Sequence, residues 1–167
     1  YAYGAYKHSV SPSFSASRFC LIDRGITFAI AHIRGGGDLG DNWHTEGKKK
    51  LKKNTFHDYI ACANHLIQQR YTHKGGLCFY GGSAGGLTGG SVANMAPELF
   101  FAMLLLVPFV DTMTTMLNEK LPLTPAEWEL WGNPIKSKEY FDYILSYSPY
   151  DNLVKKKYPP MLITSSI

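Results

Sequence analysis

The residues in this sequence with the clearest chemical potential are the five from Gly81 to Gly85, which read Gly-Gly-Ser-Ala-Gly. They fit the pattern G-x-S-x-G of the nucleophile elbow, in which a serine stands at the apex of a sharp turn between a strand and a helix. Side chains two residues before and after the serine would collide at such a turn, so glycine fits at both places. The pattern therefore predicts that the hydroxyl of Ser83 is presented outward as a nucleophile.

A helix is expected to begin just after this serine, and its first residue is Ala84. The backbone N–H of Ala84 would point to the place where the negative oxygen of a tetrahedral intermediate forms, with the positive end of the helix dipole behind it. We therefore expect Ala84 to be one donor of an oxyanion hole.

Two other glycine-rich motifs between a strand and a helix bind nucleotides, and the sequence departs from both. A dinucleotide fingerprint G-x-G-x-x-G that started at Gly81 would need glycine at position 83, where serine stands. A phosphate-binding P-loop would need Gly-Lys followed by Ser or Thr, whereas Leu87 and Thr88 follow the glycines here. A purely structural turn stays open as another interpretation, and the strand–turn–helix context favours the elbow.

The elements that must position the serine are predicted by hydrophobic pattern. Residues 77–80 indicate a buried strand before the turn, and residues 87–95 can form the helix after it. Apolar runs predict three more strands, and helical spacing of apolar residues indicates two more helices: strands Ile26–Ile33, Phe101–Val107 and Met161–Thr164, and helices Thr55–Gln69 and Ser137–Tyr147. This alternation predicts an α/β fold with a parallel sheet, in which active groups follow the carboxyl ends of strands, as Ser83 does.

Two further stretches before the elbow carry structural expectations. The run Ile26–Ile33 is almost fully apolar, as expected of a strand that is covered on both faces. Residues 11–17 are rich in Ser and Pro and are expected to be irregular.

Composition narrows the classes of protein and partner. The chain has 167 residues, which suits about one domain, and 45% hydrophobic with 18% charged residues is ordinary for a globular protein. The net charge of +4 comes largely from Lys48–Lys53, which we expect to be a solvated loop. No nucleic-acid partner is expected, because such a surface would need interleaved aromatic residues and more positive charge. No membrane partner is expected, because no apolar run is long enough to span a bilayer.

Cysteine and histidine usage argues against disulfides and metals. Cys20, Cys62 and Cys78 form an odd, scattered set in apolar segments, which predicts buried packing in a reducing compartment such as the cytoplasm. The six histidines show no metal-binding spacing, so no metal and no cofactor are expected.

Several separate motifs along essentially the whole chain carry more information than the elbow alone: Tyr1–Gly4, His32–Gly37, Leu39-Gly40, Lys53–Phe56, Gly81–Gly86, Val107–Asp111, Trp131–Pro134 and Tyr147–Asn152. With these motifs in this order, the chain resembles the prolyl oligopeptidase family of serine peptidases, and within it the oligopeptidase B group.

The resemblance implies an α/β-hydrolase domain with a mainly parallel sheet beside a β-propeller, and residues 1–167 would be part of that domain, without its C-terminal part and the propeller. Ser83 matches the nucleophile, and Tyr3 matches a tyrosine whose hydroxyl completes the oxyanion hole beside Ala84. The other interpretation of Tyr3 is a packed aromatic ring with its hydroxyl in water. Ala2 departs from the family, which usually has glycine there.

The resemblance also implies short peptide substrates that are cleaved after Lys or Arg. Glu127 and Glu129 match the acidic residues that bind this basic side chain, and two carboxylates can make charge-assisted bonds with one guanidinium. Other interpretations stay open for both. The sequence from Thr124 to Glu127, with Pro125 at the first helical position, also fits a capping box, and Glu129 could be a solvated surface acid.

The aspartate and histidine that complete the family's triad are expected downstream, but only residues 165–167 follow the last predicted strand. Asp111 and His32 also follow predicted strands, but the family gives neither of them this role. We therefore expect the chain to be nearly inactive alone and to need a downstream fragment that supplies both groups. The first residue is Tyr1 rather than Met, as expected of a piece of a longer protein. The alternatives are a non-catalytic remnant that acts as a binding module, or an esterase of the same fold.

Overall fold

The computed structural model describes residues 1–165, and residues 166 and 167 lie outside this range. Three parallel strands form one sheet in the order β1 (Leu77–Ser83), β2 (Phe100–Pro108) and β3 (Met161–Thr164). The register places Ser83 beside Pro108, so two strands end together next to the serine. The parallel sheet and these three strands confirm the predictions from the apolar runs.

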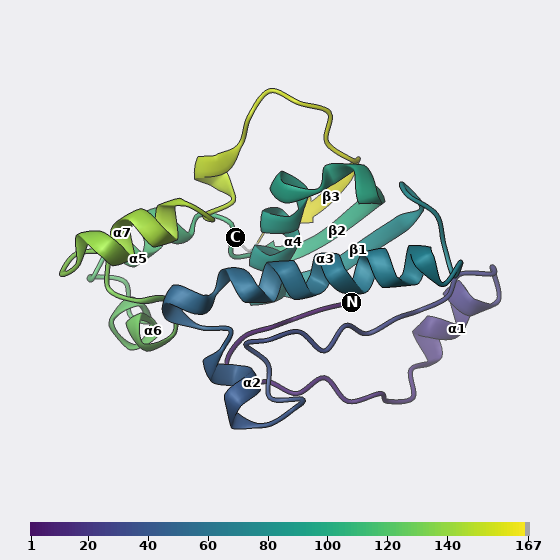
Figure 1. Ribbon diagram of the computed structural model, residues 1–167, viewed down its shortest axis with the longest axis horizontal. Coiled ribbons are helices and arrows are strands. Elements are labelled where there is room, and N and C mark those ends of the chain that lie inside the picture. Colours follow the sequence, from purple (N-terminus) through teal and green to yellow (C-terminus); the bar gives the residue numbers. More distant parts are fainter. Residues whose placement is uncertain (166–167) are drawn as a thin grey trace.

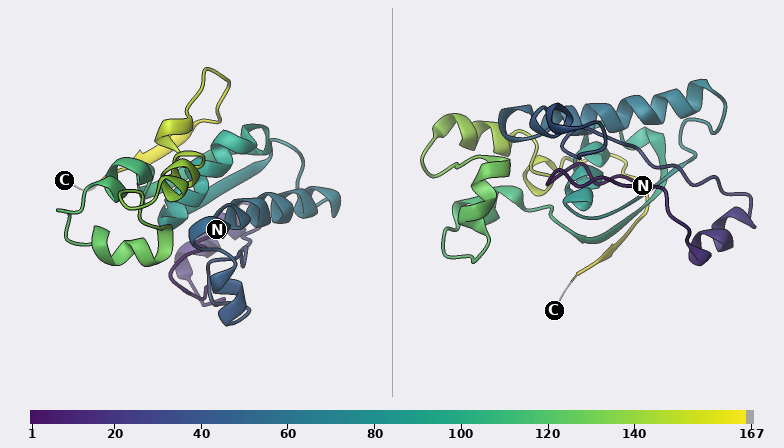
Figure 2. Two further views of the ribbon diagram at one scale, coloured as in Figure 1. Left: turned by 60° about the vertical axis from the view of Figure 1, so that its left-hand side comes forward. Right: turned by 90° about the horizontal axis from the view of Figure 1, so that it is seen from below.

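Two helices cover one face of the sheet, as Figure 2 shows from below. They are α3 (Lys53–Gln68) and α4 (Ala84–Met95). Both reach Phe79 of β1: the ring of Tyr59 in α3 lies 5.1 Å from the Phe79 ring, and a β-carbon added at Gly89 of α4 would be only 2.5 Å from it. Glycine on α4 therefore allows the close approach that brings this helix down onto the sheet.

Three further helices follow β2 and lie beyond the carboxyl ends of the strands (Figure 1). They are α5 (Thr112–Leu117), α6 (Thr124–Trp131) and α7 (Lys138–Leu145). The Asp111 side chain accepts a hydrogen bond from the Thr114 N–H at 3.2 Å and caps α5, while Ser137 caps α7 through the Tyr140 N–H. Short 3₁₀ turns complete the connections: η1 (Lys49–Leu51), η2 (Pro97–Leu99) and η3 (Tyr150–Asn152).

The first forty residues differ from expectation. The strand predicted at Ile26–Ile33 is wrong, because this segment lies extended with only two backbone bonds to Tyr1, at 2.8 and 2.9 Å, and Ile26 is exposed. Two bonds to one residue do not make a ladder. The irregular stretch around residues 11–17 gives way to a helix, α1 (Ala16–Ile22), none of whose residues is buried. A second short helix, α2 (Asp41–Thr45), follows the glycine-rich turn.

The prediction of buried cysteines is also wrong. Cys20 and Cys78 are exposed and Cys62 is half-buried, and none forms a disulfide. Cys78 points to the face of the sheet opposite α3 and α4, where Tyr80, Phe101 and Leu104 are exposed as well. The strands are therefore buried on one face only within residues 1–165. None of the helices in this range has the length and apolar character needed to span a bilayer.

Candidate active site

Ser83 stands where β1 ends and α4 begins, as the elbow pattern predicts. Its backbone has φ 52° and ψ −120°, a left-handed region that residues other than glycine rarely adopt. The Ser83 carbonyl accepts a hydrogen bond from the Phe109 N–H at 3.0 Å, which ties the apex of the turn to the end of β2. The side chain is exposed, so this strained backbone presents a serine hydroxyl to solvent.

The two glycines that flank the serine are needed for steric reasons. A β-carbon at Gly81 would lie 2.9 Å from the carbonyl oxygen of Gly85, and one at Gly85 would lie 2.6 Å from the carbonyl oxygen of Ala2. Real β-carbons do not approach oxygen this closely, so any side chain would push these segments apart. The structure confirms the steric argument and adds that Gly85 makes room for the N-terminal segment.

That segment places Tyr3 against the first turn of α4. The Thr88 hydroxyl donates a hydrogen bond to the Tyr3 carbonyl oxygen at 3.2 Å. His8 packs its ring edge-on against Tyr3 at 5.1 Å, and an open cavity of about 540 Å³ lies beside both rings. Within residues 1–165 no group hydrogen-bonds the Tyr3 hydroxyl, so this phenol can donate to a ligand.

Ala84 is the first residue of α4 and is buried. The first N–H groups of a helix have no acceptor within the helix, and they lie at the positive end of its dipole. A neutral phenol from one segment and a backbone N–H from another are the kinds of donors that stabilise a developing oxyanion.

Glu127 is held by two donors rather than by the start of its own helix. Its Oε2 accepts hydrogen bonds from the Tyr6 hydroxyl at 2.8 Å and from Trp131 Nε1 at 2.7 Å. The capping-box interpretation is wrong: Thr124 is already helical, and its hydroxyl donates to the Thr115 carbonyl instead. Burial, followed by the bond to Glu127, raises the pKa of Tyr6, which keeps this phenol protonated as a donor.

Glu129 has a different environment from Glu127. Its side chain is 83% exposed and forms an ion pair of 3.0 Å with Lys49. Residues two apart on a helix point in different directions, and the two carboxylates bind separate partners here.

The lysine run is not a uniform solvated loop. Lys49 and Lys50 form ion pairs with Glu129 and Glu139, as surface lysines do. Lys52, in contrast, is 1% exposed, and burial lowers its pKa to about 7. The sequence contained a signal for this burial, because positions 52, 56, 59 and 63 share one helical face with otherwise apolar residues.

Neither alternative triad residue reaches the serine. His32 Nε2 is hydrogen-bonded to the Val10 carbonyl oxygen at 2.8 Å, and Asp111 is the cap of α5. In the part of the chain that the structure describes, no residue hydrogen-bonds Ser83 Oγ, and no group of three His, Cys, Asp or Glu side chains is arranged to hold a metal ion. Within residues 1–165, Ser83 Oγ therefore has no hydrogen-bonded histidine or carboxylate partner.

Comparisons with known proteins give consistent matches over the whole chain. Residues 12–167 match the sequence profile of the prolyl oligopeptidase family. The chain is 50% identical over all 167 residues to dipeptidyl aminopeptidase BI of Pseudoxanthomonas mexicana and to protease 2 of Moraxella lacunata, and it covers 23% and 24% of them. The structure of oligopeptidase B from Leishmania major matches with a TM-score of 0.94 and 49% identity over 97% of this chain and 22% of that one. The chain thus spans about a quarter of the length of these relatives.

Proposed function

The chain belongs to the prolyl oligopeptidase family, and from this premise we propose that residues 1–167 are part of the catalytic domain of a serine oligopeptidase that cleaves short peptides after Lys or Arg. The expected α/β-hydrolase-type fold with a parallel sheet is confirmed by the structural likeness to oligopeptidase B. The observation that carries the proposal is Ser83, exposed at a left-handed turn between β1 and α4, with the Tyr3 carbonyl hydrogen-bonded to Thr88 of that helix.

In the proposed reaction, Ser83 Oγ attacks the carbonyl carbon of the scissile bond. The carbonyl oxygen becomes an oxyanion, which the Ala84 N–H and the Tyr3 hydroxyl stabilise. Collapse of this intermediate expels the amine product and leaves an acyl-enzyme on Ser83, and water then releases the acid product. A histidine base and its aspartate would come from the downstream segment that the family resemblance implies.

The proposed specificity rests on Glu127. Tyr6 and Trp131 both bind its Oε2, so Oε1 is the carboxylate oxygen left for a guanidinium or ammonium group. Glu129 is proposed to assist from the exposed side of the same helix, and it would first have to release Lys49. Charge-assisted bonds to these carboxylates would select Lys and Arg over neutral side chains.

We propose that this chain alone is nearly inert. Removal of the base from a serine peptidase lowers turnover by about 10⁶-fold, and the oxyanion hole and substrate binding leave about 10³ to 10⁴ over water. A segment that supplies the aspartate and histidine is therefore the proposed partner. The cytoplasm is the proposed location, which the three free thiols support.

The test compares fluorogenic peptides that end in Arg and in Phe. The chain is assayed alone and with the segment that follows it in its gene, and Ser83→Ala is the control for both. We expect cleavage after Arg only with the added segment, and none with Ser83→Ala. A fluorophosphonate label that never reacts with Ser83, even in the supplemented sample, would contradict the catalytic role and favour a binding module. Equal turnover of both peptides would contradict the Lys and Arg specificity, and hydrolysis of simple esters alone would favour an esterase.

A further inference from the structure

Lys52 is a buried amino group for which the proposed reaction has no use. It precedes α3 and is 1% exposed, and residues 1–165 offer it no carboxylate within ion-pair distance. Its Nζ donates hydrogen bonds to the Gly4 carbonyl oxygen at 2.6 Å and to the Thr55 hydroxyl at 3.1 Å. Burial of an amino group without a counter-charge is costly, so the contacts that it makes are the reason to ask what it does.

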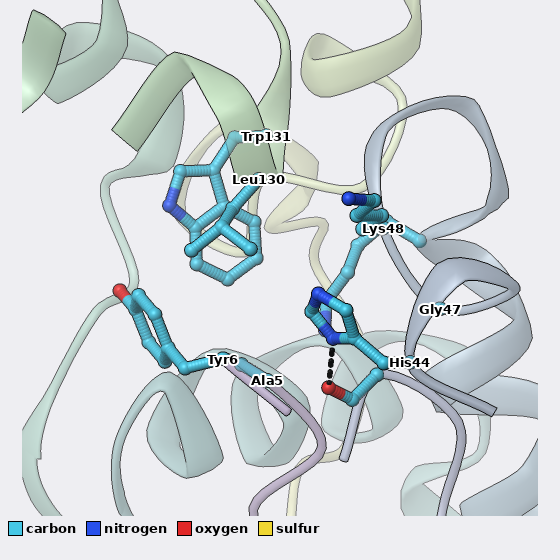
Figure 3. Close-up of a pocket in the computed structure, with 9 residues that line it drawn as sticks. Ala5, Tyr6, His44, Gly47, Lys48, Leu130 and Trp131 are labelled. Carbon is cyan, nitrogen blue, oxygen red and sulfur yellow. Dashed lines mark hydrogen bonds between the residues drawn. The ribbon is translucent and has the colours of Figure 1, made fainter. Parts of the chain in front are cut away.

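Aromatic rings form the rest of the surroundings of Lys52. Its Nζ lies 5.1 Å from the centre of the Trp131 ring and 5.8 Å from that of Phe56, distances at which a ring face attracts a cation. Figure 3 shows Tyr6 and Trp131 facing His44 and Lys48 across a crevice that Lys52 also lines and that is too narrow to admit a water molecule. Solvent therefore cannot replace the protein groups that bind this amine.

The principal acceptor, Gly4, directly follows Tyr3. A β-carbon at Gly4 would lie 2.5 Å from Thr55 Cγ2 and 2.8 Å from Ile33 Cδ1, so this residue is packed tightly as well as hydrogen-bonded. On the other side, Thr88 of α4 binds the Tyr3 carbonyl. Two consecutive carbonyl groups, those of Tyr3 and Gly4, thus accept hydrogen bonds, the first from Thr88 of α4 and the second from Lys52.

We propose that Lys52 is a positioning residue for the oxyanion hole: its amino group fixes the Gly4 carbonyl and so holds the Tyr3 hydroxyl where the oxyanion forms. This inference rests on the proposed role of Tyr3. The bond from Thr88 fixes the peptide plane between Tyr3 and Gly4, and the bond from Lys52 fixes the next plane, between Gly4 and Ala5. The two bonds together hold the backbone at Gly4, which has a φ of 75°. Lys52 also packs on Trp131, whose Nε1 donates a hydrogen bond to Glu127. It therefore connects the backbone next to Tyr3 with α6, the helix that carries Glu127.

Amide hydrogen exchange on this chain tests the anchoring without any need for activity. Lys52→Met fills nearly the same volume and removes both hydrogen bonds. The Lys7 N–H bonds to the Gly35 carbonyl and the His8 N–H to the Ala5 carbonyl, so these two amides report on the segment. We expect their exchange to become about tenfold faster or more, while the buried core variant Ile144→Val leaves them unchanged. Should Lys52→Met not fold, Lys52→Gln, whose shorter side chain keeps an NH₂ group but cannot reach as far as the lysine amine, is measured in the same way.

A double-mutant cycle tests the catalytic consequence, with kinetics measured on the chain supplemented with the downstream segment. Loss of an oxyanion donor costs about 10²- to 10³-fold in kcat, so we expect about that loss in Tyr3→Phe and a part of it in Lys52→Met, with KM little changed. In the Tyr3→Phe background, Lys52→Met should have almost no further effect.

The outcomes separate the two proposals. If Tyr3→Phe leaves kcat unchanged, the proposed oxyanion role of Tyr3 is wrong, and hydrogen exchange still decides whether Lys52 anchors the segment. If Tyr3→Phe lowers kcat but the effect of Lys52→Met multiplies in full on top of it, or if the Lys7 and His8 amides exchange at the native rate in Lys52→Met, the positioning role is overturned.

Discussion

The Tyr6 hydroxyl donates a hydrogen bond of 2.8 Å to the Glu127 carboxylate, although the two residues are 121 positions apart in the sequence. Tyr6 lies three residues after Tyr3, and Glu127 lies on α6, beyond the carboxyl ends of the strands. The bond therefore connects the segment that carries the proposed oxyanion donor to the helix that carries the proposed specificity acid. A substitution in the segment with Tyr3 and Tyr6 should therefore alter the position of Glu127, and a substitution at Glu127 should alter the position of that segment.

The hydroxyl of Tyr6 can be removed without loss of its ring, which packs edge-on against Trp131 at 5.9 Å. Tyr6→Phe should raise KM for an Arg peptide about tenfold, roughly 1.4 kcal/mol, because Glu127 loses one of its two donors and its fixed orientation. Steady-state kinetics on Arg and Phe peptides measure this effect. Tyr71→Phe, at an exposed tyrosine, is the matched control. An equal loss on both peptides would contradict the link to specificity.

The two acidic residues should respond differently to neutralisation. Glu127→Gln removes a half-buried charge with two hydrogen bonds and should lower kcat/KM for Arg peptides by about 100-fold or more. Glu129→Gln breaks an exposed ion pair with Lys49 and should change the free energy of unfolding by less than about 1 kcal/mol. Kinetics and urea unfolding of both variants check this order. A larger kinetic effect of Glu129→Gln would transfer the main specificity role to that residue.

A single methyl group at Gly85, two residues after Ser83, should disturb the position of Tyr3. Gly85→Ala would place a β-carbon 2.6 Å from the Ala2 carbonyl oxygen, which should lower the free energy of unfolding by about 1 to 3 kcal/mol and displace Tyr3. In the chain supplemented with the downstream segment, a fluorophosphonate should label Ser83 more slowly in Gly85→Ala than in the native protein. Ala61→Gly, at an exposed position of α3, costs about 1 kcal/mol by helix propensity and serves as the control. Equal labelling in both variants would contradict the displacement.

The buried amine makes stability depend on pH. Burial lowers the pKa of Lys52 to about 7, whereas the unfolded chain keeps this group protonated up to about pH 10. Between these values the unfolded state binds more protons, so the free energy of unfolding should rise with pH, by at most about 1.4 kcal/mol per unit. Below pH 7 both states are protonated and this contribution stays flat.

Urea unfolding at pH 7, 8 and 9 should therefore show a steeper rise for the native chain than for Lys52→Met. Tyr6, His44 and Lys48 are titratable groups that line the same crevice as Lys52, and Glu127 accepts a hydrogen bond from Nε1 of Trp131, whose ring contacts Lys52. They are present in both proteins, so their contributions largely cancel in the difference. Parallel pH profiles would mean that Lys52 keeps an ordinary pKa.

The parts of the fold that follow from local rules were predictable. The elbow at Ser83 needs only small residues in a fixed order between a strand and a helix, and α3 needs only a repeating apolar face. The segment Ile26–Ile33 has an equally clear apolar pattern, but a strand also needs a neighbour that supplies backbone partners, and residues 1–165 supply only Tyr1. Pairing is a property of the assembled sheet, and the pattern of one segment does not contain it.

The partners within the site were harder to predict than its members. Lys52 was hidden by its neighbours, because a run of lysines usually lies in solvent and only its helical register with Phe56 and Tyr59 marks it as buried. Glu127 fitted a capping rule that depends on where α6 begins, and the helix begins one residue earlier than that rule requires. Contacts such as Tyr6 with Glu127 join distant segments, so no local pattern reports them.

The last strand, β3, has only four residues, all exposed, and in the described part of the chain it pairs with β2 alone. Its outer side thus presents a row of backbone donors and acceptors next to the side chains of Met161, Leu162 and Ile163. Such a border can accept a strand from any source, including a second molecule. For the isolated chain, the protein concentration therefore has to be controlled. The chemistry at Ser83 is that of the monomer in dilute samples, or in samples where a short peptide is bound along this strand edge.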